Sequence, residues 1–115
     1  MTTAAHGGGR PSPKTQGVLA GMMRALGHPQ RFQLFVEILA GERSFEGGDG
    51  CFLSSIIGRL KIGAPTVSHH LKELVHAELV RTARNGKFVT CSVNREALAL
   101  LADFFARAEK QVESK

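Results

Sequence analysis

The chain has 115 residues, the size of a single domain, and a chain of this length buries roughly two thirds of the surface that it exposes when unfolded. Lys and Arg number 15 against 10 Asp and Glu, so the net charge of +5 suits a polyanionic partner, although an ordinary solvated basic surface gives the same sum. No apolar run reaches the roughly 18 residues of a membrane-spanning helix, and residues 1–14 contain no secretory signal. We therefore expect a cytoplasmic protein without membrane contact.

The beginning of the chain is predicted to be a disordered tail over residues 1–14. Gly, Pro, Ala and Thr dominate it, and too few apolar groups are present to offset the entropy of ordering. The folded domain is then expected over residues 15–113. Its first helix ends near Gly27 and is indicated by apolar residues at helical spacing, namely Val18, Leu19, Met22 and Leu26.

A second helix is predicted to begin at Pro29 and to end at Gly41. Apolar residues fall on two of its sides, so we expect this helix to be central in the fold. One stripe holds Phe32, Phe35, Val36 and Leu39, and the other holds Leu34 and Ile38.

Three short elements are predicted between the second helix and the next long one. A glycine-rich loop over 42–50 leads to a short strand over 51–53 and then to a helix over 54–60. The hydroxyl of Ser54 is expected to cap this helix.

The next helix is predicted over about 64–77, after a turn at Gly63. Pro65 opens it because the missing N–H of proline costs nothing in the first turn. On a helical wheel the apolar residues fall on one side, namely Val67, Leu71, Leu74 and Val75, and the polar ones on the other, namely Thr66, His69, Lys72, Glu73 and His76. One face therefore packs, and the other is free to contact a partner.

A β-hairpin follows this helix. Asn85-Gly86 is the strongest two-residue hairpin signal, and strand-like residues flank it over 79–84 and 87–93. The second strand places alternate side chains on one side, namely Val89, Cys91 and Val93. A helix with a polar face followed by a basic hairpin is typical of a winged helix.

The last helix is predicted to begin after Asn94, a favourable N-cap, with Glu96 in its first turn. Its apolar residues approach a seven-residue repeat, namely Leu98, Leu101, Phe105, Ala108 and Val112. Packing on the chain's own core would cover part of this stripe, and a partner chain would cover the rest.

Three motifs in order connect the chain to a known family: ALGHPQR at 25–31, TVSHHLKEL at 66–74, and LVR at 79–81 with NGKFV at 85–89. With them, the chain over about residues 15–110 resembles the ArsR/SmtB family of small bacterial transcriptional repressors. The resemblance implies a mainly α fold with a small β-hairpin wing, a winged helix-turn-helix in the order α-α-(β)-α-α-β-β-α. It also implies a homodimer formed through the first and last helices, an inverted-repeat DNA operator, no cofactor and a bacterial cytoplasm.

DNA contacts are expected from the recognition helix over about 64–77 and from the wing over 81–91, through Pro65, Thr66, Ser68, His69, Lys72, Arg81, Arg84, Asn85 and Lys87. Hydroxyls and His69 suit base edges or phosphates, Lys72 suits a phosphate, and Arg84 and Lys87 flank the hairpin tip. Simpler interpretations exist: Ser68 could bond its own backbone, and the wing cations could only be solvated. His70 lies near the apolar side and is expected to be an interior histidine.

The dimer interface that the resemblance implies is expected at Val18, Met22, Leu101, Phe104 and Phe105. The same family often releases DNA when a metal or metalloid binds. Its usual two thiol positions correspond to Phe52 and Ser54, which cannot bind soft cations, and the last helix has no histidine, so we expect no metal site of the family type.

Cys51 and Cys91 could still lie on paired strands and act as a thiol switch or a metalloid site. We favour the simpler view that Cys91 is a small buried hydrophobe.

Three classes of function are compared. The leading one is a DNA-binding repressor with an unknown small inducer, if any. The second is a winged-helix module that binds protein rather than DNA, and the thiol sensor is a further variant. The third, an enzyme, is not expected, since no C-x-x-C, no nucleophile-histidine order and no phosphate-binding glycine loop occurs.

Overall fold

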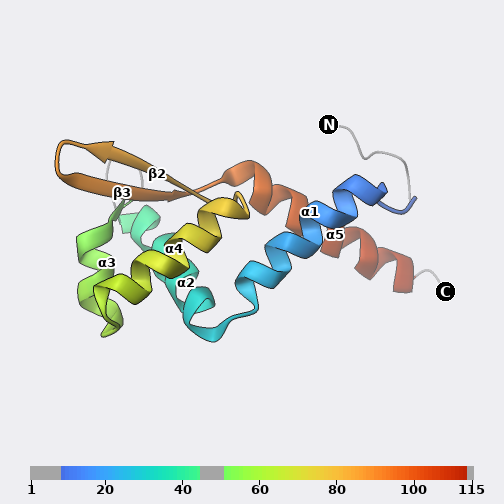
Figure 1. The fold of residues 1–115 in the computed structure, drawn as a ribbon. Coiled ribbons are helices and arrows are strands. Elements are labelled where there is room, and N and C mark those ends of the chain that lie inside the picture. The colour runs from blue at the N-terminus through green and yellow to red at the C-terminus, as the bar shows by residue number, and fades with distance from the viewer. Residues whose placement is uncertain (1–8, 45–50, 114–115) are drawn as a thin grey trace.

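The structure, a computed structural model, describes residues 9–44 and 51–113. The helices in these parts are α1 (Pro13–Leu26), α2 (Pro29–Ser44), α3 (Leu53–Leu60), α4 (Ala64–His76) and α5 (Arg95–Glu113). The strands are β1 (Cys51–Phe52), β2 (Val80–Asn85) and β3 (Phe88–Val93), and they form one antiparallel sheet in the order β1-β3-β2. Five helices with a small three-stranded sheet confirm the predicted winged helix-turn-helix (Figure 1).

Helix α1 begins at Pro13, two residues before the predicted start of the domain. The hydroxyl of Ser12 caps it by accepting a hydrogen bond from the backbone N–H of Thr15 at 3.1 Å. Residues 1–8 of the predicted tail lie outside the described residues. As predicted, the helix ends before Gly27, whose N–H donates to the carbonyl of Arg24.

Helix α2 continues to Ser44, so the prediction that Gly41 ends it is wrong. An ideal Cβ placed on Gly41 would lie 2.6 Å from the Sγ of Cys51. The glycine is therefore needed because β1 crosses the helix closely, not because the helix stops. The carboxylate of Glu42 also accepts a hydrogen bond from the backbone N–H of Val93, which attaches the end of α2 to β3.

Only part of the apolar surface of α2 is internal. Leu34, Phe35 and Ile38 are buried, whereas Phe32 and Val36 are exposed. The helix is central, as predicted, and packs against α1, α3, α4 and the sheet. The predicted apolar stripe of Leu34 and Ile38 is thus buried, whereas the predicted stripe that begins at Phe32 is only partly covered within one chain.

Helix α3 begins at Leu53, and its N-cap Phe52 makes no side-chain capping bond, so the prediction of a Ser54 cap is wrong. The helix ends at Leu60, and its C-cap Lys61 is a left-handed residue with φ of 57° that turns the chain toward α4. The carbonyl of Gly63 then accepts from the N–H groups of Thr66 and Val67, which starts the recognition helix with Pro65 in its first turn.

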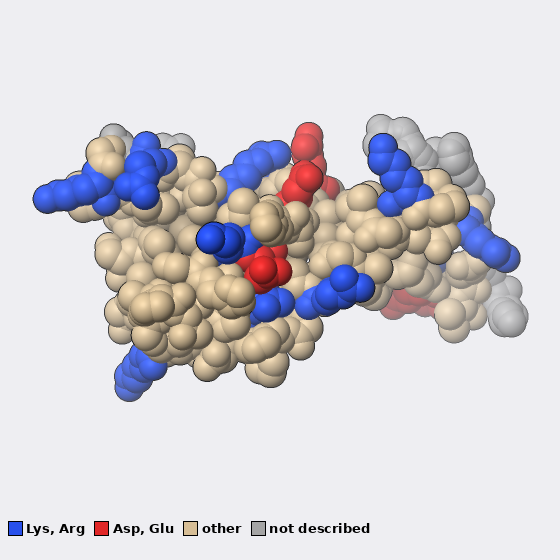
Figure 2. All heavy atoms as spheres, viewed as in Figure 1, with Lys and Arg blue, Asp and Glu red and all other residues tan. Residues whose placement is uncertain are grey.

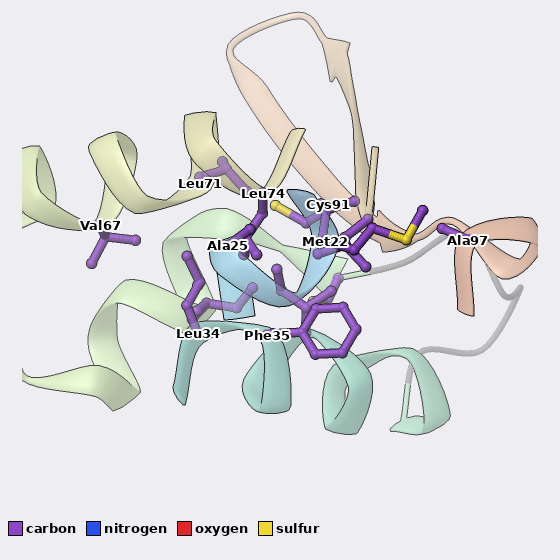
Figure 3. Packing of buried hydrophobic residues seen from close by; sticks show 14 of the residues in the cluster. Met22, Ala25, Leu34, Phe35, Val67, Leu71, Leu74, Cys91 and Ala97 are labelled. Atoms are coloured by element: carbon purple, nitrogen blue, oxygen red, sulfur yellow. The ribbon is translucent and has the colours of Figure 1, made fainter. Parts of the chain in front are cut away.

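The core lies between α4, α2 and α1. The predicted apolar face of α4 is buried through Val67, Leu71 and Leu74, and Figure 3 shows these side chains pointing toward Leu34 and Phe35 of α2. The opposite face of α4 is left to solvent. No described helix is long and apolar enough to span a membrane.

Strands β2 and β3 form a long hairpin closed by Gly86, which has φ of 65°, in the register Arg84 opposite Val89. Helix α5 then starts as predicted, because the Oδ1 of Asn94 accepts from the N–H of Glu96 at 3.1 Å. The wing and the far end of α5 project from opposite ends of a molecule of 50 × 28 × 24 Å (Figure 1).

Candidate nucleic-acid interface

The outward face of α4 carries every residue expected there as a DNA contact. Pro65, Thr66, Ser68, His69 and Lys72 are all exposed. The helix thus presents hydroxyl, imidazole and ammonium groups along one surface, the side-chain types that bond to base edges and phosphates.

His70 behaves differently from its neighbour His69. It is only 5% exposed, and its Nε2 lies 3.2 Å from the Oε1 of Gln30 at the start of α2. Burial lowers the pKa of His70, and the positive charges of His28, Arg31 and His69 would act in the same direction. The expectation of an interior histidine is therefore met.

The wing carries the remaining expected contacts. Arg81, Arg84 and Lys87 are exposed, while the side chain of Asn85 lies outside the described residues. Arg81 is 3.9 Å from the carboxylate of Glu96, and both side chains are largely exposed, so this ion pair is weak.

The remaining cations of α4 and the wing have no carboxylate partner in the part of the chain that is described. This holds for Lys72, Arg84 and Lys87. Figure 2 shows Lys and Arg side chains gathered at the tip of the wing. Unpaired cations on a projecting hairpin are available to a polyanion without first breaking an internal ion pair.

Two exposed aromatic side chains support the wing, a role that was not predicted for them. The rings of Phe52 and Phe88 lie 5.8 Å apart at 55°, on neighbouring strands of the sheet. Phe88 precedes the alternating positions Val89, Cys91 and Val93 and therefore faces the other side of the sheet. The alternation of side chains along the strand could have indicated which side of the sheet Phe88 faces. The contact with Phe52 could not be predicted, because it depends on the pairing of two strands that are distant in sequence.

The residues expected at a dimer interface divide into two groups. Met22 and Leu101 are buried in the core of their own chain, so they offer a partner little surface. Val18 and Phe105 are exposed, and the half-buried Phe104 packs edge-on against Phe105 with ring centroids 5.2 Å apart. The exposed apolar surface of α5 also includes Leu98 and Val112.

The two cysteines face each other. Strand β1 pairs with β3 so that Cys51 lies opposite Cys91, which confirms the prediction that paired strands carry them. Both are free and buried. Burial raises the pKa of the Cys91 thiol to about 12 and also raises that of Cys51, although Arg59 opposes the latter shift. Because the thiolate is the reactive form, this environment favours their interpretation as core residues.

The positions that correspond to the thiols of the metal-sensing relatives, Phe52 and Ser54, hold no soft ligand. Within 9–44 and 51–113, no group of three or more His, Cys, Asp or Glu side chains is arranged to hold a metal ion.

Comparisons with known proteins agree with this geometry. The family model for bacterial regulatory proteins of the arsR family matches residues 44–82, which include α3, α4 and the start of the wing. An HTH-type transcriptional regulator of Bacillus subtilis strain 168, YbzH, is 32% identical over 90 residues, covering 72% of this chain and 90% of the relative.

Solved structures share the fold. An ArsR-like transcriptional regulator from Rhodococcus sp. RHA1 superposes with a TM-score of 0.69 at 20% identity, over 88% of both chains. The homodimeric winged helix-turn-helix domain Mb0332 of Mycobacterium bovis, described as a possible ArsR-family regulator, gives a TM-score of 0.62 at 21% identity, over 93% of this chain and 94% of that one. The chain therefore belongs to the ArsR family of bacterial transcriptional regulators, which have a winged helix-turn-helix DNA-binding fold.

Proposed function

We propose that the protein is a homodimeric repressor that binds an inverted-repeat DNA operator in a bacterial cytoplasm. The family and the fold are those of transcriptional regulators and not of enzymes. The observation that carries the proposal is the separation of α4 into a buried apolar face and an exposed face of hydroxyl, imidazole and ammonium groups.

Helix α4 would lie in the major groove. Thr66, Ser68 and His69 lie in its first half, where side chains of a recognition helix reach base edges, and Lys72 follows one turn later to contact a phosphate. Pro65 starts the helix, and its exposed ring would lie near the backbone of the duplex.

The wing would contact the adjacent backbone or minor groove. Arg84 and Lys87 flank the tip of the hairpin, and Arg81 lies at its base. A narrow minor groove has an enhanced negative potential that attracts such side chains. Asn85 is proposed as a further contact on sequence grounds alone.

A second copy of the chain would cover the exposed apolar surface of α1 and α5. Of the residues expected at the interface, Val18 and Phe105 are exposed and would contact the partner directly. Phe104 packs against Phe105. Met22 and Leu101 lie beneath them in the core. The homodimeric state of Mb0332 supports this assembly. Two recognition helices related by a twofold axis enter successive major grooves about 34 Å apart, which requires an inverted repeat.

Fluorescence anisotropy tests the proposal. It measures binding to a mixed-sequence duplex of 30 base pairs between 50 and 200 mM salt. The double variant Lys72→Gln with Arg84→Gln should lower affinity and reduce the slope of log K against log salt by about 3.6, since the dimer loses two phosphate contacts from each protomer and each neutralised phosphate contributes about 0.9. The control is Arg10→Gln with Lys14→Gln, which removes the same charge near the start of α1 and should leave the slope unchanged.

An equal loss of slope in both double variants would mean that binding follows net charge and not the proposed surface. If the wild type retains no duplex even at 50 mM salt, the protein-binding module becomes the better description.

A further inference from the structure

Three residues join the corner between α1 and α2 to the recognition helix. His28 and Gln30 lie at the start of α2, and His70 lies on the buried side of α4. We refer to His28, Gln30 and His70 as the corner triad. The proposed DNA contacts use none of them.

The hydrogen bond between His70 and Gln30 fixes the tautomer of His70. An amide oxygen only accepts, so the Nε2 of His70 must donate to the Oε1 of Gln30 across their 3.2 Å separation. In a neutral imidazole the other nitrogen, Nδ1, then carries a lone pair. Nδ1 is buried and has no hydrogen-bond partner in the described parts of the chain.

His28 is also held in one tautomer. Its carbonyl accepts the first intrahelical bond of α2 from the N–H of Phe32 at 2.8 Å, which places His28 at the N-cap. Its Nδ1 accepts from the N–H of Gln30 at 3.2 Å and so must be unprotonated. The imidazole therefore acts as the capping side chain of α2.

Among the described residues, the titratable groups that act on His70 are two imidazoles and a guanidinium, with no carboxylate. The ring of His28 lies 4.6 Å away, that of His69 lies 5.8 Å away, and Arg31 approaches from α2. The guanidinium of Arg31 donates to the carbonyl of Ala25 at 3.3 Å, and its buried Nε has no partner in the described residues. A proton on the Nδ1 of His70 would thus be a buried donor without an acceptor, beside an existing positive charge.

We infer that the corner triad positions the recognition helix and does so only while His70 is neutral, so that mild acid releases α4 from its DNA-binding placement. This inference rests on the proposed function for its effect on DNA and on side-chain geometry for its mechanism. The three residues are positioning residues, because none of them lies on the exposed face of α4. They act on that face through the placement of His70 within the helix.

The direction of the pH effect follows from linkage. Burial lowers the pKa of His70 below its ordinary value of 6.5. Below pH 6.5 the unfolded chain therefore binds a proton at this imidazole more readily than the native chain does. The triad is therefore fully formed above pH 6.5. Its contribution is lost as the pH falls from 6.5 toward the lowered native pKa.

Two measurements on the full chain test the triad without DNA. Long-range ¹H–¹⁵N NMR at pH 7.5 should show His28 and His70 both as Nε2–H tautomers. Thermal unfolding should show the midpoint of the wild type falling between pH 7.5 and 5.5, and His70→Gln should flatten this dependence. Gln keeps a donor toward Gln30 but does not titrate.

The matched control is His69→Gln, which removes the adjacent, exposed histidine and should keep the pH dependence. In this His69→Gln background, duplex affinity should fall over the same pH range, and adding His70→Gln should abolish most of that fall. The background is needed because His69 is itself a proposed DNA contact.

An Nδ1–H tautomer at either histidine, or an unfolding midpoint independent of pH in the wild type, would overturn the inference, whether or not His70→Gln folds. A pH-dependent midpoint with pH-independent duplex affinity would reject the link to the recognition helix. If no variant binds duplex at any pH, the proposed DNA binding fails, and the link to DNA binding fails with it.

Discussion

The wing and the far half of α5 both project from the core, but their exposed surfaces differ in chemistry. The wing exposes Arg81, Arg84 and Lys87 on a hairpin. Helix α5 exposes an apolar stripe at seven-residue spacing, namely Leu98, Phe105 and Val112. The α5 stripe denotes these three residues below.

This contrast supports the different partners proposed for the two ends of the molecule. Cations on a hairpin suit a polyanion, which releases counterions when they bind. Apolar side chains every seven residues suit another helix, and a second copy of α5 supplies the same pattern in return. Net charge alone would not reveal this division, because it averages over both ends.

The largest effect is expected from a charge in the α5 stripe. Phe105→Glu should weaken the dimer by about 4 kcal/mol, because a carboxylate would replace a ring at the centre of an apolar interface. Sedimentation velocity would show a monomer at micromolar concentrations. Phe88→Glu is the matched control, since the two rings are 55% and 52% exposed and Phe88 lies in the wing. A dimer that survives Phe105→Glu would move the interface elsewhere.

A smaller effect is expected on sequence preference at the recognition helix. His69→Ala should reduce discrimination between a selected operator and single-mismatch duplexes by about 1–3 kcal/mol at one base position, while binding to random duplex changes little. Competition binding with a set of mismatched duplexes measures this. Unaltered discrimination at every position would remove His69 from the reading surface.

The core that connects the two ends should respond to crowding at one glycine. Gly41→Ala should destabilise the fold by about 1–3 kcal/mol, because the new methyl group would overlap the Sγ of Cys51. Gly58→Ala in α3 meets no atom within 4 Å and should be neutral or slightly stabilising. Chemical denaturation compares them, and adding Cys51→Ala should recover part of the loss. Equal stability of the two variants would contradict the close contact.

The smallest effect is expected from thiol chemistry. Because Cys51 and Cys91 are buried and their thiol pKa values are raised, arsenite or an oxidant such as diamide should change duplex affinity by less than about twofold at pH 7.5. Anisotropy titration with each reagent checks this. A large release of DNA that disappears in Cys51→Ala would restore the thiol-sensor alternative.

Local patterns predicted most of the elements. The spacing of Val67, Leu71 and Leu74 gave the buried face of α4, and Asn85-Gly86 gave the hairpin. These signals depend on residues close in sequence, so they can be read without the fold.

Tertiary contacts account for what could not be predicted. A glycine that ends a helix and a glycine that makes room for a crossing strand look alike in sequence, so the role of Gly41 follows only from the packing of β1 against α2. The expected cap at Ser54 failed because α3 starts directly from β1. The contact between Gln30 and His70 joins residues 40 positions apart, which no local pattern encodes.

The most direct test of the claim that two recognition helices bind one duplex is to select bound sequences from a random duplex library. The sequence most enriched is then examined by hydroxyl-radical footprinting. The account predicts an inverted repeat with two protected half-sites about 34 Å apart on one side of the duplex. Enrichment of a single half-site, or of no sequence at all, would contradict it.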